Sequence, residues 1–248
     1  MLLAVDIGNT NIALGIFKGK SLLKRYTLAT KTKPYTLALK GIICRNKINN
    51  AIICSVVPKA TAQIAKDITA SLGKRPLIIG KDISVPVKNL YRKPKQVGQD
   101  RLVNAYAGIR LYKAPLVAVD FGTAITFDVV SKKGGYLGGM IIPGLGISLD
   151  ALKRRTALLP AVKLKRPEEF IGKDTKNSML SGIIYGFAAL TDDLVMRIKN
   201  KIGRKAQIIG TGGNINLIKP YCRRIDKIDP DLTLKGLRLI YEEAACSR

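Results

Sequence analysis

Histidine and tryptophan are absent from the 248 residues, and acidic side chains are few. Without histidine the chain has no Ser-His-Asp or Cys-His nucleophile, no histidine-ligated metal and no histidine general base. Any proton transfer must therefore fall to a carboxylate, or less commonly to lysine, tyrosine or cysteine. The four cysteines are scattered and form no C-x-x-C pair. This pattern indicates reduced thiols rather than a disulfide framework or a zinc site.

A secretory leader and a membrane helix are also missing from the sequence pattern. The N-terminus has no basic segment followed by a long apolar stretch, and no apolar run approaches the roughly 20 residues that a membrane helix needs. Hydrophobic residues make up 47% of the composition, which is ordinary for a folded protein. We therefore expect a soluble cytoplasmic protein with no membrane partner.

Negative charge is scarce: 43 Lys and Arg stand against 17 Asp and Glu, a formal net charge of +26. Such a field attracts polyanions, including ATP, acidic metabolites and nucleic acid. The basic residues are spread along the chain, with no arginine-rich tail, helix-turn-helix or RNA-binding signature. We therefore expect only non-specific attraction of nucleic acid, and a general compositional bias is the simplest reading of the charge.

An internal repeat is the most informative feature that the sequence does contain. Leu3–Thr10, LAVDIGNT, returns as Val117–Ala124, VAVDFGTA. Each copy is an apolar strand that ends in Asp-x-Gly, and each leads into a second strand. Because repeats set the architecture, we predict an α/β protein of two duplicated domains, residues 1–114 and 115–248, that face each other across a cleft.

Hydrophobic periodicity places further elements between and after the repeats. Apolar runs without polar alternation suit strands of a sheet covered by helices. Strands are predicted at 22–28, 51–57, 76–80 and 206–209, and helices at 59–73, 100–112, 150–159, within 175–202 and at 235–246. The glycine-rich segment 138–144 is predicted to be a hairpin.

Both copies of the repeat could bind phosphate. In the first, Asp6 ends a strand, Gly8 permits a tight turn, and the side chains of Asn9 and Thr10 can face a phosphate beside backbone N–H groups. Asp120-Phe121-Gly122-Thr123 offers the same arrangement. Asp and Gly are also ordinary turn formers, but two copies in register predict a clamp on the β- and γ-phosphates of ATP, with a carboxylate near the neutralising cation.

Gly210-Thr211-Gly212-Gly213 follows a predicted strand and precedes a predicted helix. Glycines there allow a flat ligand to approach the backbone, and a helix N-terminus adds a favourable dipole. A simple strand-to-helix turn is the alternative. The chain contains no Walker A loop, and no G-x-G-x-x-G follows the first strand, so a dinucleotide site is not expected.

Gly98-Gln99-Asp100-Arg101 opens a predicted helix. Asp100 could be only an N-terminal cap or a partner of the helix dipole. With the phosphate turns, another role arises: Arg101 can hold a substrate carboxylate, and Asp100 can accept a proton from the hydroxyl that attacks the γ-phosphate.

Six segments together resemble the type III pantothenate kinases: DIGNTN, YRKPKQVGQDR, DFGTAIT, GGMIIPG, IGKDT and IGTGG. They follow the family's order across almost the entire chain. The resemblance implies two ribonuclease-H-like (actin-like) domains facing each other across a nucleotide cleft. It also implies transfer of the γ-phosphate of ATP to pantothenate, the first step of coenzyme A biosynthesis.

The same resemblance assigns the site residues and the cofactors. The first phosphate loop comprises Asp6, Ile7, Gly8, Asn9, Thr10, Asn11, Ile12 and Ala13. Asp100 is the general base, and the pantothenate site comprises Tyr91, Gly98, Gln99, Asp100, Arg101 and Thr175. Thr123 and Gly212 bind ATP, Asp120 binds a monovalent cation (K⁺ or NH₄⁺), and Asp6 is a candidate ligand of the Mg²⁺ that accompanies ATP. Since the equivalent of Thr175 comes from a neighbouring subunit in the family, a homodimer is implied.

Two other functions stay open at this point. A kinase of the same superfamily could act on a sugar or another hydroxy acid, because substrate choice depends on the site and not on the fold. Arg92-Lys93 also departs from the family pattern in the substrate loop. A nucleic-acid-binding or transcription accessory protein would suit the charge, but it would have no need of the ATP-site and base residues.

Overall fold

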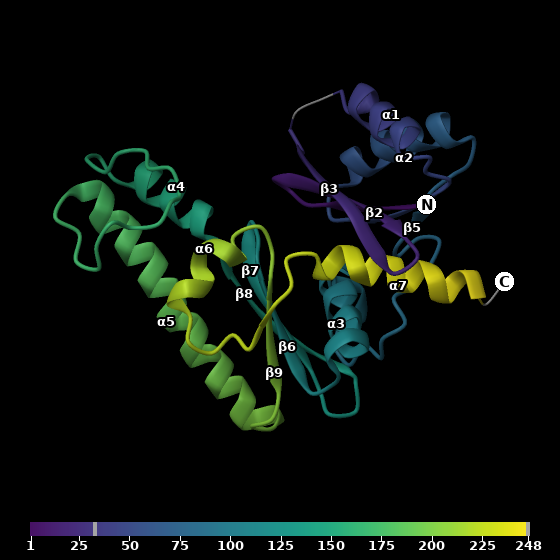
Figure 1. The fold of residues 1–248 in the computed structure, drawn as a ribbon. Helices are drawn as coiled ribbons and strands as arrows, with labels where there is room; N and C mark the ends of the chain where they lie inside the picture. Colours follow the sequence, from purple (N-terminus) through teal and green to yellow (C-terminus); the bar gives the residue numbers. More distant parts are fainter. Residues whose placement is uncertain (32–33, 247–248) are drawn as a thin grey trace. The chain divides into compact units, whose positions relative to one another are not determined.

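The computed structural model describes residues 1–31 and 34–246 and divides the chain into two compact units (Figure 1). Unit 1 comprises Met1–Val87, Arg92–Ala107 and the chain from Leu232 onward, and unit 2 comprises Lys88–Tyr91 and Gly108–Asp231. This division differs from the predicted one at 114/115. The chain passes into unit 2 within a helix, and the C-terminal helix belongs to unit 1.

Unit 1 is built on a five-stranded mixed sheet in the order β3-β2-β1-β4-β5. The first three strands are antiparallel neighbours, and β4 and β5 run parallel to β1. The strands are β1 (Leu2–Ile7), β2 (Asn11–Lys18), β3 (Ser21–Ala29), β4 (Asn50–Ser55) and β5 (Leu77–Ile78). Every predicted strand of this half is present, although β5 is shorter than the 76–80 run.

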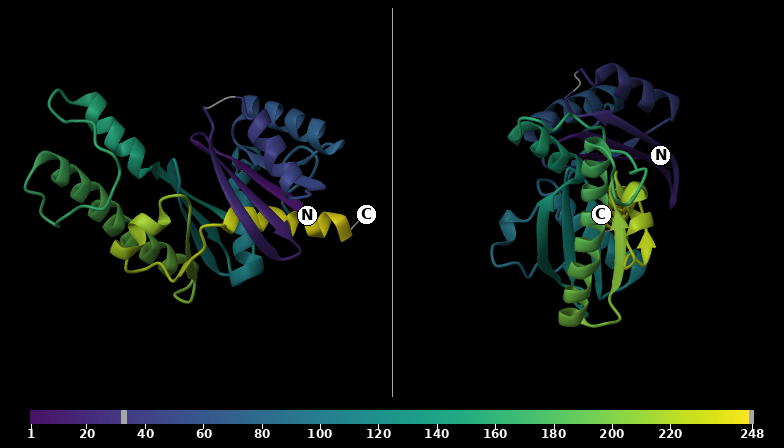
Figure 2. Two further views of the ribbon diagram at one scale, coloured as in Figure 1. Left: turned by 45° about the horizontal axis from the view of Figure 1, so that its top comes forward. Right: turned by 90° about the vertical axis from the view of Figure 1, so that its left-hand side faces the viewer.

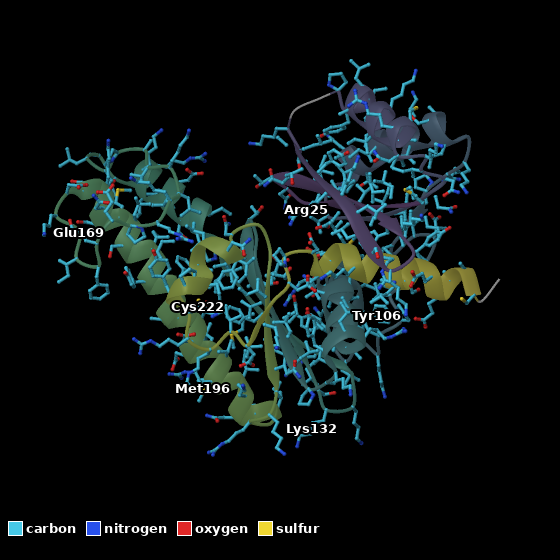
Figure 3. All side chains as sticks on the ribbon, viewed as in Figure 1. Arg25, Tyr106, Lys132, Glu169, Met196 and Cys222 are labelled. Carbon is cyan, nitrogen blue, oxygen red and sulfur yellow. The ribbon has the colours of Figure 1, made fainter. Side chains whose placement is uncertain are left out.

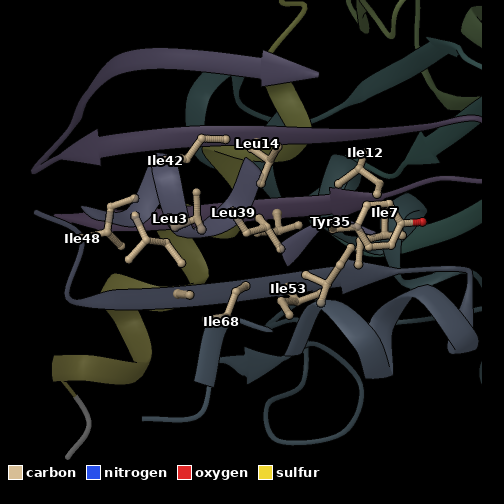
Figure 4. Packing of buried hydrophobic residues seen from close by; sticks show 14 of the residues in the cluster. Leu3, Ile7, Ile12, Leu14, Tyr35, Leu39, Ile42, Ile48, Ile53 and Ile68 are labelled. Carbon is tan, nitrogen blue, oxygen red and sulfur yellow. The ribbon is translucent and has the colours of Figure 1, made fainter. Parts of the chain in front are cut away.

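Helices α1 (Thr36–Arg45) and α2 (Pro58–Leu72) supply apolar side chains to one hydrophobic core with this sheet (Figure 4). Leu3 on β1 and Leu39 on α1 are both fully buried in that cluster. Helix α2 begins with Pro58 and ends at Gly73, whose φ of 71° is left-handed; both are common helix-boundary choices. Helix α1 was not predicted, and it lacks the usual start signals: no side chain in the described part of the chain caps it and its first turn contains no acidic residue.

Helices α3 (Gln99–Tyr112) and α7 (Leu232–Cys246) pack together within unit 1. A Cβ at Gly236 of α7 would lie 2.7 Å from Val103 Cγ1 of α3, so only glycine permits this approach. Thr233 Oγ1 donates a hydrogen bond of 2.7 Å to Asn104 Oδ1. This contact, made far apart in sequence, is why the C-terminal helix joins the first unit. The short helix η1 (Pro94–Gln96) precedes α3.

Unit 2 repeats the same sheet, in the order β10-β9-β6-β7-β8. Its strands are β6 (Leu116–Phe121), β7 (Ala124–Val130), β8 (Tyr136–Pro143), β9 (Gln207–Thr211) and β10 (Lys227–Ile228). The predicted hairpin at 138–144 is wrong, since β8 fills most of that segment. The turn lies earlier, where Ser131 N donates to Gly135 O at 2.9 Å.

The long helix α5 (Thr175–Ile202) covers one face of the unit 2 sheet (Figure 2). By length and apolar composition alone it could cross a membrane. Its apolar stripe, however, packs into the core with the strands, through residues such as Ile184 and Val195. The other helices of unit 2 are α4 (Leu145–Arg155), which begins five residues before the prediction, α6 (Ile215–Ile218) and η2 (Lys219–Tyr221).

The register shows how closely the two sheets correspond. Asp6 pairs with Ala13 in unit 1, and Asp120 pairs with Thr126 in unit 2. The first turn is one residue longer, because its closing pair is Ile7 with Ile12 whereas the second closes with Phe121 and Ile125. The predicted duplication of an α/β domain is confirmed, with this single insertion in the first phosphate turn.

Candidate active site

The turn between β1 and β2 is held by three hydrogen bonds. Gly8 N donates to Asn11 O at 3.0 Å, and Thr30 N donates to Thr10 O at 2.9 Å. Thr30 Oγ1 also donates to Gly8 O at 2.7 Å. Ile7 and Ile12 are fully buried on either side, while Asn9, Thr10 and Asn11 are exposed. The buried Ile7 and Ile12 therefore hold a short polar turn whose side-chain amide and hydroxyl groups lie at the surface of unit 1.

A buried thiol lies beside this turn. Cys54 pairs with Asp6 across the parallel β1–β4 ladder, and its side chain is fully buried. Burial raises the pKa of the Cys54 thiol well above its usual value, and the negative charges of Asp6 and Asp100 raise it further. Both carboxylates thus lie close to one neutral thiol. The fold brings together two site residues that are far apart in sequence.

Asp100 occupies the first turn of α3, as the sequence predicted. Its Oδ1 accepts a hydrogen bond of 2.9 Å from Arg101 N. Burial raises the pKa of the Asp100 carboxyl, and the amide and charge of Arg101 oppose this only in part. A Cβ at Gly98 would lie 2.4 Å from Asp100 Oδ1, so any other residue there would displace the carboxylate. Gly98 therefore leaves the space that the Asp100 carboxylate occupies.

Arg101 and Gln99, the residues on either side of Asp100, are both packed within the structure. Arg101 is 8% exposed, although its side chain is charged. The Gln99 side chain covers Gly80, where a Cβ would lie 2.9 Å from Gln99 Cδ and where φ is +80°. Glycine at position 80 thus allows the loop after β5 to contact the start of α3. Gly98, Gln99, Asp100 and Arg101 all belong to unit 1, and the charge of Asp100 acts on the Cys54 thiol of β4.

In unit 2 the turn after β6 is enclosed by two glycines. Gly122 N donates to Ala124 O at 3.1 Å, and Gly144 N donates to Thr123 O at 3.1 Å. A Cβ at Gly144 would lie 2.2 Å from Thr123 O, which is an impossible distance. Thr123 itself is exposed. The backbone of Gly144, just before α4, therefore packs against this second turn and hydrogen-bonds to it.

Gly212 completes this second cluster. It has a φ of +92°, and a Cβ there would lie 2.3 Å from Asp120 Oδ1 and 2.7 Å from Phe121 N. Asn214 N donates to Phe121 O at 3.1 Å and ties the same loop to β6. Gly212, which was predicted in a separate motif, is thus brought next to the turn of Asp120 and Thr123 at the carboxyl end of β6.

Tyr91 belongs to a short segment that pairs with the edge of β8. Leu90 N donates to Tyr136 O at 2.9 Å, and Tyr136 N donates to Lys88 O at 2.9 Å. The Tyr91 ring lies against Gly138, where a Cβ would be 3.1 Å from Tyr91 Cδ2. Tyr91 is 37% exposed, which leaves part of the ring open to a ligand.

Thr175 is the exposed first residue of α5. Asp174 caps that helix by accepting a hydrogen bond of 2.9 Å from Asn177 N, and this bond lowers the pKa of the Asp174 carboxyl. Ser178 Oγ donates to Gly172 O at 3.1 Å. These bonds tie the helix start to the preceding loop and not to the turn of Asp120, so unit 2 does not place Thr175 with the other predicted residues.

The sequence reasoning missed several residues that shape the site. Cys54 was read as a buried or idle thiol, Thr30 and Gly80 were not singled out, and Gly144 was included only as the end of the glycine-rich segment 138–144. The position of Cys54 opposite Asp6 depends on the pairing of β4 with β1. The roles of Thr30, Gly80 and Gly144 are recognised only by their tertiary contacts.

Comparison with known proteins identifies the family of this chain. The sequence model described as type III pantothenate kinase matches residues 2–197. The type III pantothenate kinase of Moorella thermoacetica is 44% identical, with 98% of this chain and 99% of that protein covered. The corresponding protein of Geobacter sulfurreducens is 42% identical over 98% of both chains.

Solved structures agree on the fold. A conserved putative Baf family transcriptional activator from Campylobacter jejuni aligns with a TM-score of 0.59 at 18% identity, over 99% of this chain and 100% of that one. The activator of 2-hydroxyisocaproyl-CoA dehydratase from Clostridium difficile, with bound ADPNP, also reaches 0.59, at 14% identity over 99% of this chain and 96% of that one. The predicted actin-like α/β fold is confirmed, and the chain belongs to the type III pantothenate kinase family.

Proposed function

We propose that this chain transfers the γ-phosphate of ATP to the hydroxyl of pantothenate, giving 4′-phosphopantothenate at the first step of coenzyme A biosynthesis. The observation that carries the mechanism is the placement of Asp100. This carboxylate is held by a backbone amide, is desolvated by burial, and lies near the same thiol as Asp6 of the first phosphate turn. A soluble enzyme of the cytoplasm suits this activity.

Asp100 acts as the general base. Phosphoryl transfer asks the protein mainly to position the reactants and to neutralise charge, so one carboxylate is sufficient for the proton. A base works best when its pKa approaches the working pH, and burial moves the pKa of Asp100 in that direction. The hydrogen bond from Arg101 N fixes one carboxylate oxygen and thereby orients the other.

Arg101 holds the carboxylate of pantothenate. A guanidinium can donate two parallel hydrogen bonds to a carboxylate, which fixes its orientation as well as its position. Burial of Arg101 strengthens such a contact because water is excluded. Gly98, Gln99 and Tyr91 complete the pantothenate site, and a sugar would offer Arg101 no carboxylate to bind.

The two strand-turn-strand units bind the phosphates of ATP. Asp6 to Ala13 supply amide, amide-side-chain and hydroxyl groups in unit 1, and Thr123 and Gly212 contribute from unit 2. The half-buried Asp6 carboxylate suits Mg²⁺, which binds proteins through one or two carboxylates and takes its other ligands from phosphates and water. When bound, Mg²⁺ would neutralise the phosphate charge.

Asp120 binds the monovalent cation, potassium or ammonium. Its Oδ1 lies against Gly212, and the carbonyls of Gly122 and Thr123 lie beside Gly144, so the turn is rich in oxygen atoms. Replacing potassium by sodium is expected to lower the rate of ADP formation. The variant Asp120→Asn should be slow in both salts, because its amide lacks the charge that holds the cation.

Asp193→Asn is the matched control for the cation site. Asp193 is an exposed carboxylate on α5 that pairs with Arg197 at 2.5 Å, remote in sequence from the turn. This variant should keep the full potassium dependence. A wild-type rate that is equal in potassium and sodium would remove Asp120 from this role.

The enzyme works as a homodimer in which Thr175 reaches the pantothenate site of the neighbouring subunit. The exposure of Thr175 at the start of α5 supports this role. Thr175→Ala and Asp100→Asn should each be slow alone, yet a mixture of the two refolded together should regain activity, since mixed dimers contain one intact site. Rates in the mixture no higher than the mean of the two parents, or a fully active monomer, would refute the shared site.

The choice of acceptor separates pantothenate from the alternatives. Mass spectrometry should detect phosphorylated pantothenate after incubation with ATP, Mg²⁺ and potassium, and no phosphorylated glucose or glycerate. Phosphorylation of glucose or glycerate in place of pantothenate would leave the assignment of the phosphate-binding turns intact but would show that pantothenate is not the substrate. Absence of any phosphorylated acceptor, with tight binding of nucleic acid at moderate salt, would favour a binding protein.

A further inference from the structure

A pocket of about 540 Å³ lies in unit 2 beside the turn between β7 and β8. Residues of that turn, of the segment that begins at Lys88 and of the C-terminal end of α5 line it. The Asp120 turn precedes β7, whereas this pocket follows it. A seven-residue strand separates them, roughly 20 Å of extended chain. The pocket is therefore separate from the Asp120 turn, and Tyr91 of the proposed pantothenate site does not line it, although its neighbour Leu90 does.

Four lysines line this pocket, and together they carry its charge: Lys88, Lys132, Lys133 and Lys201. Figure 3 marks Lys132 in the turn that follows β7. None of the four forms an ion pair within the described part of the chain, whereas Lys165, Lys173 and Lys199 do. Lys201 also complements the negative end of the α5 dipole. Lys88, Lys132 and Lys133 lie outside α5, so the helix dipole does not account for them.

The wall of the pocket is apolar. Leu90 and Leu137 are 47% and 42% exposed, which is high for leucine, and both line the pocket together with Ile202. Leu90 is held in place because a Cβ at Gly135 would lie only 2.7 Å from Leu90 Cδ1. The backbone bond from Leu90 N to Tyr136 O fixes the same residue. The apolar wall is thus formed before any ligand binds.

We propose that this pocket binds a small phosphate ester with an apolar chain. Uncompensated ammonium groups favour an anion with several charges, and the leucines favour an alkyl portion. The volume falls within the range of small-molecule sites. Among the described residues, none of those that line the pocket is aromatic, although stacking on aromatic rings is the usual way to hold single-stranded nucleic acid.

Isothermal titration of the full-length protein with n-hexyl diphosphate tests the site, with the ATP site first saturated by a non-hydrolysable ATP analogue and Mg²⁺. We expect one molecule to bind, about 10-fold more tightly than inorganic pyrophosphate, because only the former buries alkyl carbons. The variant Leu137→Asn should remove that preference and leave the binding of pyrophosphate unchanged.

The lysine variants supply the second arm of the test. Lys132→Ala with Lys201→Ala should weaken n-hexyl diphosphate about 10-fold or more, as expected for two lost charge-assisted contacts. The control pair, Lys20→Ala with Lys24→Ala, removes the same charge from exposed positions in unit 1 and should change affinity less than about 2-fold. Equal losses in both pairs, no preference for the alkyl chain, or tighter pocket binding of a short oligonucleotide would overturn the proposal.

Discussion

Asp100→Asn is expected to lower turnover about 10²–10⁴-fold, the usual contribution of a general base. Asparagine keeps the size and the hydrogen bond to Arg101 N, but it cannot accept the proton of the attacking hydroxyl. The affinity for ATP should stay near the wild-type value, because the phosphate turns are untouched. Steady-state rates and calorimetric binding of an ATP analogue measure both quantities. An unchanged turnover would remove Asp100 as the base.

The pH dependence of the wild-type rate, and of the stability of wild type and Asp100→Asn, supplies an independent check on the role of Asp100. Since burial raises the pKa of Asp100, the wild-type rate should fall on acidification at a higher pH than the ordinary aspartate value of about 3.9. A carboxyl with a raised pKa binds its proton more tightly in the folded state, so its ionisation costs stability. The free energy of unfolding of Asp100→Asn should therefore exceed that of wild type at neutral pH, and this difference should vanish below the ordinary aspartate pKa.

Gly212→Ala is expected to lower the free energy of unfolding by about 2–4 kcal/mol, from a left-handed backbone and a forced overlap. At a φ of +92°, the new Cβ would lie 2.3 Å from Asp120 Oδ1 and 2.7 Å from the backbone at Phe121. Backbone atoms on β6 cannot move aside cheaply. The loop should therefore shift away from Asp120, and chemical denaturation with ATP-analogue titration should show losses of both stability and affinity.

The next residue provides the control for this change. A Cβ at Gly213 meets nothing within 4 Å, and its φ lies outside the left-handed range. Gly213→Ala should therefore change stability by less than about 0.5 kcal/mol, as for most surface substitutions. Similar losses of stability in both variants would show that the loop tolerates no side chain at either position. The loss in Gly212→Ala could then no longer be attributed to the overlap with Asp120.

The fold was predictable from the sequence mainly because the repeat marks the same strand twice. Leu3–Thr10 and Val117–Ala124 predicted two duplicated α/β domains, and the structure contains two five-stranded sheets with corresponding strand orders. The placement of α7 was not predictable, because it depends on a close contact between Gly236 and Val103 that local pattern does not encode. Helix α1 was missed because no described side chain caps its start and its first turn contains no acidic residue, so the local boundary signals are absent.

The site shows the same division between local and tertiary information. Asp6, Asp100 and Asp120 stand in short motifs whose chemistry can be read directly from the sequence. Gly144 and Gly80 matter only because a distant backbone or side chain approaches them. The combined effect of Asp6 and Asp100 on the Cys54 thiol likewise depends on tertiary structure, because β4 pairs with β1 and Asp100 comes from a helix much later in the chain. Their roles in catalysis stay predictions.

The release of ADP by the purified protein tests the central claim most directly. The assay contains ATP, Mg²⁺ and potassium, and it is run with and without pantothenate. We expect ADP release that depends on pantothenate and yields phosphorylated pantothenate in equal amount. ADP release that pantothenate does not stimulate would contradict the proposed reaction, whatever the fold and the family of the chain.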